Sequence, residues 1–234
     1  MAFTTFTFFK LQRFKDRWWA FQQMGKARAI LADQANPFSK LMGTGGKSGF
    51  SVWPDWSTYL LLQVWKSSAE AEAFFQKNEW YGEYRQRASQ FLRVEARAFR
   101  SHGKWNGLNP FENQTGNADA PTIGVLTRAS IKPGLLPQFW RYVPGVSKNI
   151  FERPGLYMAK GVGEIPLLEQ ATFSIWDSVK LMQQFAYEQK EHARVVKKTR
   201  ELEWYSEELF ARFEILSVKG NWQEWKQKFP MNEE

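Results

Sequence analysis

The chain repeats itself, because its two halves carry the same order of strand-like and helix-like segments. The first half covers residues 1–112, a polar linker covers 113–121, and the second half covers 122–234. Anchor residues recur in both halves in the same order, which indicates an internal duplication. The matches are Val64-Trp65-Lys66-Ser67-Ser68 with Ile175-Trp176-Asp177-Ser178-Val179, Phe74 with Phe185, Leu41-Met42 with Tyr157-Met158, Gly103-Lys104-Trp105 with Gly220-Asn221-Trp222, and Phe21 with Phe139.

Hydrophobic periodicity predicts the order β-α-β-β-α-β in each half. In the first half, the strands are expected at residues 3–10, 38–43, 58–65 and 94–102, and the helices at 16–32 and 67–91. In the second half, the strands are expected at 122–129, 156–161, 169–176 and 211–219, and the helices at 135–150 and 178–200. Ser67 is the expected N-cap of its helix, with Glu70 as the capping-box partner.

One βαββαβ module folds as a ferredoxin-like sheet with two helices on one face. The other face of that sheet needs an apolar cover, and a tandem copy supplies it. The sequence therefore predicts an α+β protein in which two tandem ferredoxin-like βαββαβ modules form an intramolecular dimeric α/β barrel.

Composition excludes several kinds of site. Cysteine is absent, so disulfides, cysteine-ligated zinc, iron–sulfur clusters and thiol catalysis are excluded. His102 and His192 are the two histidines, too few for a His-rich metal cage. The side chains of the 12 Trp and 20 Phe have large flat surfaces, which must be buried against one another or against a flat ligand.

The net charge of +8 is compatible with nucleic acid, an anionic membrane surface or an anionic ligand as partner. An RNA-recognition module shares the βαββαβ order, but its basic-aromatic signature is missing here, so we expect no nucleic-acid partner. The N-terminus lacks the pattern of a signal peptide, and the apolar run 59–65 is too short to cross a bilayer. We therefore expect a cytoplasmic protein, with peripheral membrane contact favoured by its basic surface.

His192 is the strongest candidate for a functional side chain. On the helix 178–200, Met182, Phe185, His192 and Val196 are spaced by three, four or seven residues, so they share one inward stripe. An imidazole in that place is either a half-buried histidine with a hydrogen-bond partner or a ligand of iron. The matching residue of the first half is Tyr81, which leaves one half able to offer a histidine.

Other charged residues have structural and functional interpretations. Arg194 and its neighbours Lys197, Lys198 and Arg200 form either a solvated helix face or a partner for carboxylates. Arg212 lies between aromatic residues on a predicted strand and needs a partner, for which Glu214 and Glu169 are candidates. We expect His102 in an exposed loop, and the pair Glu207-Glu208 solvated in an amphipathic turn.

Several unusual strings resemble one family. They are Phe9-Lys10 with Trp18-Trp19, Lys40-Leu41-Met42-Gly43-Thr44-Gly45, Gly103-Lys104-Trp105, Thr172-Phe173-Ser174-Ile175-Trp176, and Trp204-Tyr205-Ser206-Glu207-Glu208-Leu209-Phe210-Ala211-Arg212-Phe213. Over nearly its whole length the chain resembles the spheroidene monooxygenases, which are carotenoid ketolases, and beyond them the dimeric α/β-barrel monooxygenases. The resemblance implies a haem-dependent monooxygenase that uses dioxygen to oxidise an allylic methylene of a linear carotenoid to a hydroxyl or a ketone.

The resemblance also assigns expected roles. His192 is the expected axial ligand of the haem iron, and Met182, Phe185 and Arg194 are the expected haem-binding residues. Arg212 is the expected catalytic residue beside bound oxygen. An apolar small-molecule substrate, an external electron donor such as ferredoxin and a homo-oligomer are the expected partners. The alternative is a haem-binding or haem-processing α/β-barrel protein without carotenoid activity.

Overall fold

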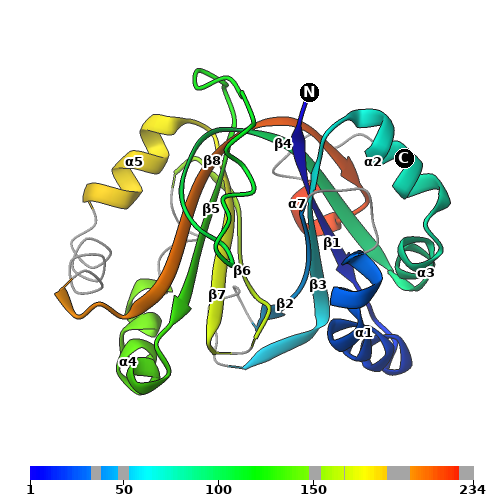
Figure 1. Ribbon diagram of the computed structural model, residues 1–234, viewed down its shortest axis with the longest axis horizontal. Coiled ribbons are helices and arrows are strands. Elements are labelled where there is room, and N and C mark those ends of the chain that lie inside the picture. Colours follow the sequence, from blue (N-terminus) through cyan, green and yellow to red (C-terminus); the bar gives the residue numbers. More distant parts are fainter. Residues whose placement is uncertain (33–37, 47–52, 148–153, 166, 189–200, 227–234) are drawn as a thin grey trace.

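The computed structural model describes residues 1–32, 38–46, 53–147, 154–165, 167–188 and 201–226 (Figure 1). The first half forms β1 (Phe3–Lys10), α1 (Phe14–Ala32), β2 (Phe38–Gly45), β3 (Pro54–Trp65), α2 (Ser68–Lys77), α3 (Glu79–Arg87) and β4 (Gln90–Gly103). The second half forms β5 (Ile123–Ile131), η1 (Pro133–Leu135), α4 (Leu136–Ser147), β6 (Leu156–Gly163), β7 (Glu169–Trp176), α5 (Val179–Glu188), β8 (Tyr205–Gly220) and α7 (Gln223–Lys226).

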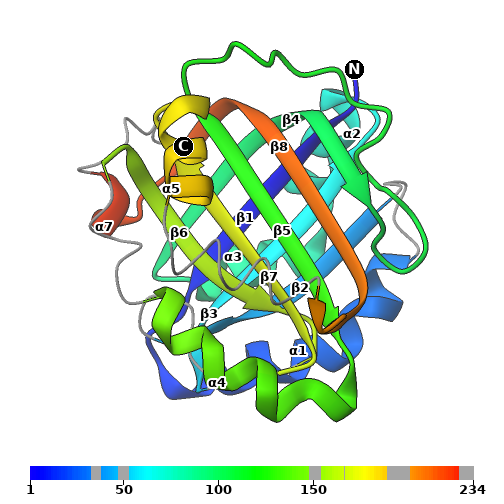
Figure 2. The same ribbon diagram turned by 90° about the vertical axis from the view of Figure 1, so that its left-hand side faces the viewer.

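Eight antiparallel strands close into one barrel in the order β1-β3-β2-β6-β7-β5-β8-β4. Within each half the order is ferredoxin-like, with β4-β1-β3-β2 in the first sheet and β8-β5-β7-β6 in the second. The sheets join where β4 pairs with β8 and where β2 pairs with β6. Figures 1 and 2 show α1, α2 and α3 outside the first sheet and α4 and α5 outside the second. The predicted fold class is therefore confirmed.

The two Gly-x-Trp strings, residues 103–105 and 220–222, have the same local structure in both halves. Gly103 and Gly220 both have positive φ, and the carbonyl oxygens of Glu208 and Phe91 lie where their side chains would begin. The next residue of each string donates its backbone N–H to that same carbonyl, at 2.7 Å in the first half and 3.1 Å in the second. Trp105 and Trp222 then follow as buried side chains. The strings therefore close the barrel in the same way in both halves.

The matched tryptophan–phenylalanine pairs occupy equivalent places. The ring centroids of Trp65 and Phe74 lie 5.3 Å apart, and those of Trp176 and Phe185 lie 5.2 Å apart. In both halves the pair joins the last residue of a strand to the helix that follows it. The duplication predicted from these residues is confirmed.

Aromatic side chains from both sheets fill the interior of the barrel. Phe6 stacks on Phe173 with ring centroids 3.9 Å apart, and Phe213 meets Phe6 edge-on at 5.3 Å. Trp222 and Trp225 stack at 4.8 Å, and Trp225 also meets Phe8 edge-on. Offset stacks and edge contacts of this kind are the favoured arrangements of aromatic rings. The interior is thus a packed core, which leaves the outer faces of the sheets as the place for a ligand site.

The predicted helix 67–91 is wrong in its extent. Ser67 is the N-cap, as predicted, and accepts the backbone N–H of Glu70 at 3.3 Å. The helix ends at Lys77 because Asn78 is extended, and the Asn78 side chain caps a second helix by accepting the N–H of Tyr81 at 2.9 Å. An asparagine side chain competes with helical hydrogen bonds in this way. Phe91 lies on β4 rather than on the helix.

The predicted strand 211–219 is too short, because β8 begins at Tyr205. The predicted helix 135–150 is formed as η1 and α4 up to Ser147, and the helix 178–200 as α5 up to Glu188. The rest of these two helices lies outside the described residues. Among the helices of the described ranges, none combines the length and the apolar character needed to span a bilayer.

We expect Gly103→Ala to lower the free energy of unfolding by about 3 kcal/mol. The new methyl group would collide with the backbone of Glu208, and the alanine would have to adopt a φ of +86°, which L-residues rarely do. Gly220→Ala should cost a similar amount, since Phe91 occupies the equivalent place. Urea unfolding followed by circular dichroism measures both values.

Alanine substitutions at two further glycines distinguish the cost of the collision from the cost of the strained backbone. Gly107 has φ +81° with open space around it, so Gly107→Ala should cost only about 1 kcal/mol. Gly25 lies on α1 with open space and an ordinary φ, so Gly25→Ala should be neutral or slightly stabilising. Equal losses in Gly103→Ala and Gly107→Ala would show that the close approach to β8 contributes nothing.

Candidate functional site

The outer face of the first sheet is fully packed. Helices α1, α2 and α3 lie on it and form one cluster of buried side chains with it. Tyr84 is wholly buried there, and its ring lies 4.7 Å from that of Trp19 and 4.8 Å from that of Trp80. Phe9 packs against the same tyrosine at 5.0 Å. This face of the first sheet is therefore occupied by the packing of its own helices.

The outer face of the second sheet carries two smaller clusters instead of one. The first surrounds α5 and has Ile123, Val125, Trp176 and Met182 as its buried members. The second lies against α4 and has Ile131, Phe139 and Trp204 as its buried members. Between them Thr127 is exposed, although β5 is a central strand of the sheet. The described helices thus leave the middle of this face uncovered.

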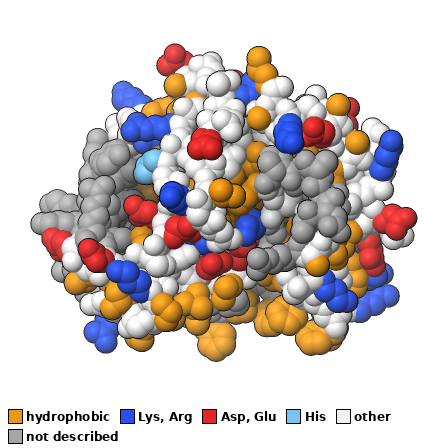
Figure 3. Space-filling model, in the orientation of Figure 1, with side chains coloured by type: hydrophobic (Ala, Val, Ile, Leu, Met, Phe, Trp, Pro, Cys, Tyr) orange, Lys and Arg blue, Asp and Glu red, His pale blue; other side chains and the backbone are white. Residues whose placement is uncertain are grey.

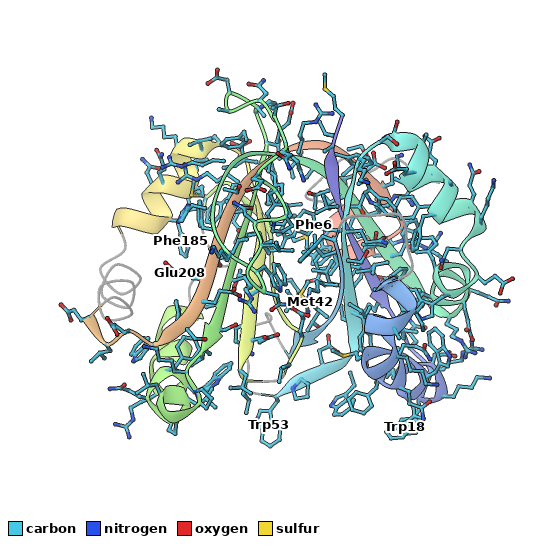
Figure 4. All side chains as sticks on the ribbon, viewed as in Figure 1. Phe6, Trp18, Met42, Trp53, Phe185 and Glu208 are labelled. Atoms are coloured by element: carbon cyan, nitrogen blue, oxygen red, sulfur yellow. The ribbon has the colours of Figure 1, made fainter. Side chains whose placement is uncertain are left out.

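A row of four side chains crosses this middle region. His102 on β4 is the cross-strand partner of Phe210 on β8, which in turn faces Thr127 on β5. Thr127 is paired with Thr172 on β7. Figure 4 shows Phe185 of α5 and Glu208 of β8 on the same outer side of this sheet. We call this region, with its row and the α5 cluster above it, the outer-face site.

Three of the predicted site residues meet at the outer-face site. Met182 is 4% exposed and packs in the α5 cluster, and Phe185 packs on Trp176 within the same cluster. Arg212 lies on β8, directly across from Val125 of β5 and one row away from the His102–Phe210 pair. The sequence pattern placed Met182 and Phe185 on one helix and Arg212 on a strand, and the fold brings both elements onto one face.

Arg212 is a buried cation on this face. It is 8% exposed, and the central carbon of its guanidinium lies 5.3 Å from the ring centroid of Phe210. Of the two carboxylates considered as its partners, Glu169 pairs with Arg128 at 3.3 Å and Glu214 accepts the N–H of Asn117 at 3.0 Å. Burial and the ring of Phe210 thus hold this guanidinium on the outer face of the sheet.

His192 and Arg194 lie outside the described residues, in the segment after α5, so their predicted roles stay predictions. Lys197, Lys198 and Arg200 lie in the same segment. Tyr81, the counterpart of His192, is described. It is buried against the first sheet, where Arg93 donates to its hydroxyl oxygen at 3.2 Å.

His102 is exposed, as predicted, but it lies within a strand and not in a loop. It is on β4, with its ring centroid 5.3 Å from that of Phe210. A bulge between Ala98 and Arg100 shifts the register of β4 against β8. Beyond this bulge the alternation of faces changes, which turns His102 to the outer side beside Phe210.

A second polar cluster, around Arg128, was missed in the sequence. Arg128 points to the inside of the barrel and its side chain is 1% exposed. It pairs with Glu207 and with Glu169, and its guanidinium lies 5.4 Å from the ring of Trp105. Glu207 also accepts the backbone N–H groups of Asn106 and Gly107, each at 2.8 Å.

The prediction that Glu207 is solvated is therefore wrong. The expected turn is in fact the start of β8, and Glu207 faces inward there. Burial raises the pKa of Glu207, but the N–H groups of Gly107 and Asn106 and the charge of Arg128 outweigh it, so the pKa is lowered. For Glu169, burial and the negative charge of Glu164 raise the pKa despite Arg128. This cluster ties the Gly103–Trp105 string to β8 and is structural.

The donor set of the outer-face site suits a flat, partly anionic ligand better than a bare metal ion. Within the described ranges, no three histidine or acidic residues gather closely enough to hold a metal. That search does not test haem, which needs one axial ligand and an apolar, aromatic surface. Phe185 and Phe210, which are only partly buried, supply such a surface, and Arg212 supplies a cation beside it. The residues present therefore fit a haem with carboxylate groups.

We expect Glu207→Gln to lower the free energy of unfolding at neutral pH by about 2 kcal/mol, because it leaves Arg128 buried with less charge compensation. Since the folded-state pKa of Glu207 is lowered, its contribution is present above about pH 4.5 and is lost as the pH falls further. Thermal unfolding from pH 7 to pH 3 should thus show a smaller loss on acidification in the variant. Glu208→Gln, at the exposed neighbour, is the control and should behave like the wild type. A similar curve for both variants would contradict the pairing.

Comparisons with known proteins place the chain among named relatives. Spheroidene monooxygenase of Rhodobacter capsulatus is 34% identical over 208 residues, which cover 87% of this chain and 86% of that protein. The protein of the same name from Rubrivivax gelatinosus is 36% identical over 193 residues, covering 82% and 73%. That from Cereibacter sphaeroides is 32% identical over 226 residues, covering 95% and 69%. No protein-family model matches the chain.

Solved structures agree on the fold. An aldoxime dehydratase superposes with a TM-score of 0.62 at 13% identity, covering 92% of this chain and 81% of that one. An aldoxime dehydratase crystallised with butyraldoxime gives 0.60 at 11% identity, covering 92% and 79%. At such low identity the likeness concerns the fold alone. The sequence identities over most of the length of three relatives, together with the closed barrel, show that the chain belongs to the spheroidene monooxygenase family.

Proposed function

We propose that the chain is an oxygen-dependent monooxygenase that oxidises an allylic methylene of an apolar polyene, such as a linear carotenoid, to a hydroxyl or a ketone. Membership of the spheroidene monooxygenase family supports the substrate class and the reaction type. The observation that carries the assignment to a site is the contrast between the two sheets. One outer face is packed by three helices, while on the other the described helices leave a central strand uncovered beside a buried arginine.

We propose haem as the cofactor and the outer-face site as its place. His192 would bind the haem iron, Met182 and Phe185 would pack against the haem, and Arg194 would pair with one of its carboxylates. The bound haem would supply an iron centre at which dioxygen is activated. The position of Tyr81 supports the choice of His192, since this counterpart in the first half lies buried against its own sheet.

Arg212 is the proposed catalytic residue. Its guanidinium is held by burial and by the ring of Phe210, and it cannot lose its proton at working pH. A fixed donor of this kind stabilises negative charge that develops on oxygen, and a low-dielectric surrounding strengthens the effect. The apolar side chains around it would keep water from the site and accept the polyene.

The oxidation balances with an external donor. Each hydroxylation takes one dioxygen, two electrons and two protons, leaves one oxygen atom on the carbon and releases one water. A second hydroxylation at the same methylene gives a geminal diol, which loses water to become a ketone. A small electron-transfer protein such as ferredoxin would supply the electrons, since the chain has no cysteine and hence no iron–sulfur cluster of its own.

We expect His192→Ala to abolish haem binding, whereas His102→Ala and Tyr81→Phe should keep it. The visible spectrum and the haem content of each purified protein measure this. Loss in His102→Ala alone would assign the exposed histidine of β4 as the ligand and refute the role of His192. A wild-type protein without any Soret band would refute haem, whereas haem without turnover would favour a haem-binding barrel protein.

We expect Arg212→Gln to lower kcat about a hundredfold with haem content unchanged, because it removes a fixed positive charge beside the reacting oxygen. Arg212→Lys should recover part of that loss, since it keeps the charge but not the planar fork. Arg100→Gln is the control, because Arg100 is the cross-strand neighbour of Arg212 but is exposed. Equal losses at both positions would point to general electrostatics instead of a catalytic arginine. Substrate turnover with a reduced electron donor is the measurement.

A further inference from the structure

Exposed apolar side chains gather on one side of the molecule. The side formed by α1, the start of β3 and the loop between β6 and β7 is here called the basal face. Of the eleven large hydrophobic side chains that are exposed in the described part of the chain, seven lie on it. They are Phe14, Trp18, Phe21, Trp53, Trp56, Ile165 and Leu167. Figure 3 shows hydrophobic side chains along the corresponding lower edge of the molecule.

Helix α1 is apolar on two opposite faces. Ala20, Ala27 and Leu31 point to the first sheet and are buried. On the opposite side, Phe14 and Trp18 are 82% and 52% exposed and share one stripe by their spacing. A surface helix normally presents polar residues to water. The outer stripe therefore needs another explanation than the packing of the barrel.

The aromatic residues of the basal face support one another across elements. The ring centroids of Trp18 and Phe21 lie 5.8 Å apart, and those of Phe21 and Trp56 lie 4.6 Å apart. Trp53, which immediately precedes β3, is 77% exposed. Figure 4 shows Trp18 and Trp53 pointing away from the barrel on the same side. These aromatic side chains form a row of outward-facing rings on one side of the molecule.

The second half contributes to the same side through equivalent elements. Figures 1 and 2 place α4, the counterpart of α1, at the same end of the molecule as α1. Trp140 of α4 donates its indole N–H to the carbonyl of Leu167 at 3.2 Å, which ties α4 to the loop between β6 and β7. Ile165 and Leu167 of that loop are 48% and 39% exposed. Both halves thus present apolar side chains in one direction.

The charges of the basal face are unbalanced toward the positive. Lys15 and Lys26 are exposed and flank the Trp18 stripe on the helix surface. The nearby acidic residues are already paired: Asp55 with Lys160 at 3.8 Å, and Glu164 with Lys40 at 2.7 Å. The lysines of the face are therefore available to an anionic partner, in line with the net charge of +8.

We propose that the basal face docks on the surface of a bilayer that contains anionic lipids. Tryptophan and phenylalanine are the side chains that favour the boundary between headgroups and acyl chains. Each lysine beside an anionic headgroup layer contributes favourable energy. A second copy of the chain is a poorer occupant, because a two-fold contact would set these lysines against themselves. Docking on a bilayer does not require substrate turnover, so it can be tested independently of the proposed function.

Co-sedimentation of the full-length protein with vesicles tests the proposal. We expect binding to vesicles of phosphatidylcholine with about one third phosphatidylglycerol, and weaker binding to phosphatidylcholine alone. Trp18→Gln with Trp53→Gln should weaken binding at least about tenfold. Lys15→Gln with Lys26→Gln should weaken binding to the anionic vesicles about tenfold and remove most of its salt dependence. The control is Leu216→Gln, an exposed leucine of β8 at the opposite end of the barrel, which should bind like the wild type.

A second measurement keeps the test independent of folding defects. Brominated acyl chains should quench the tryptophan fluorescence of the wild type and quench that of Trp18→Gln with Trp53→Gln much less, while both proteins keep the same circular dichroism. Wild-type protein that binds neither vesicle, or a tryptophan variant that binds as well as the wild type, would overturn the proposal. Self-association that disappears in the tryptophan variant, without vesicle binding, would assign the face to contact between copies.

Discussion

The pairing of β4 with β8 is the constraint on which the rest of the structure depends. It runs from Leu92 opposite Gly220 to Gly103 opposite Leu209, so each half contributes its last strand and its Gly-x-Trp string to the other half. Gly103 and Gly220 allow the two strands to approach closely at the ends of this pair, where any side chain would collide with the backbone of the other strand. Two tryptophans then cover the core next to those ends. Without this seam each sheet would expose its inner aromatic face to water.

The same seam decides which residues reach the second sheet's outer face. Its register shifts between Ala98 and Arg100 and again between Glu95 and Ala96. A shift of one residue changes the face of every side chain that follows. This is why His102 reaches the outer side, where it joins Phe210 and Arg212, which alternate along β8 with the core residues Leu209 and Phe213. The site and the closure of the barrel are thus consequences of one pair of strands.

Duplication followed by divergence explains how one fold can be rigid and functional at once. The first outer face is filled by large aromatic residues from three helices, which stabilise the barrel. The second keeps the same strand framework but replaces part of that packing by Arg212 and by threonines on β5 and β7. A bilayer below the basal face would lie next to α4, which borders this second face. An apolar substrate could then pass from lipid to the site with little exposure to water.

The sequence by itself determined the duplication, the order of the elements and the barrel, because strand and helix periods and the Gly-x-Trp strings are local signals. The helical stripe also predicted that Met182 and Phe185 face inward, and both pack against the second sheet. Only the tertiary structure decided that Asn78 breaks the second helix, that Glu207 compensates Arg128, and that His102 faces Phe210. Those outcomes depend on a competing side-chain hydrogen bond, on an ion pair between residues 79 positions apart, and on a strand bulge. Contacts between distant segments of this kind leave no periodic trace in the chain, so the fold alone fixes them.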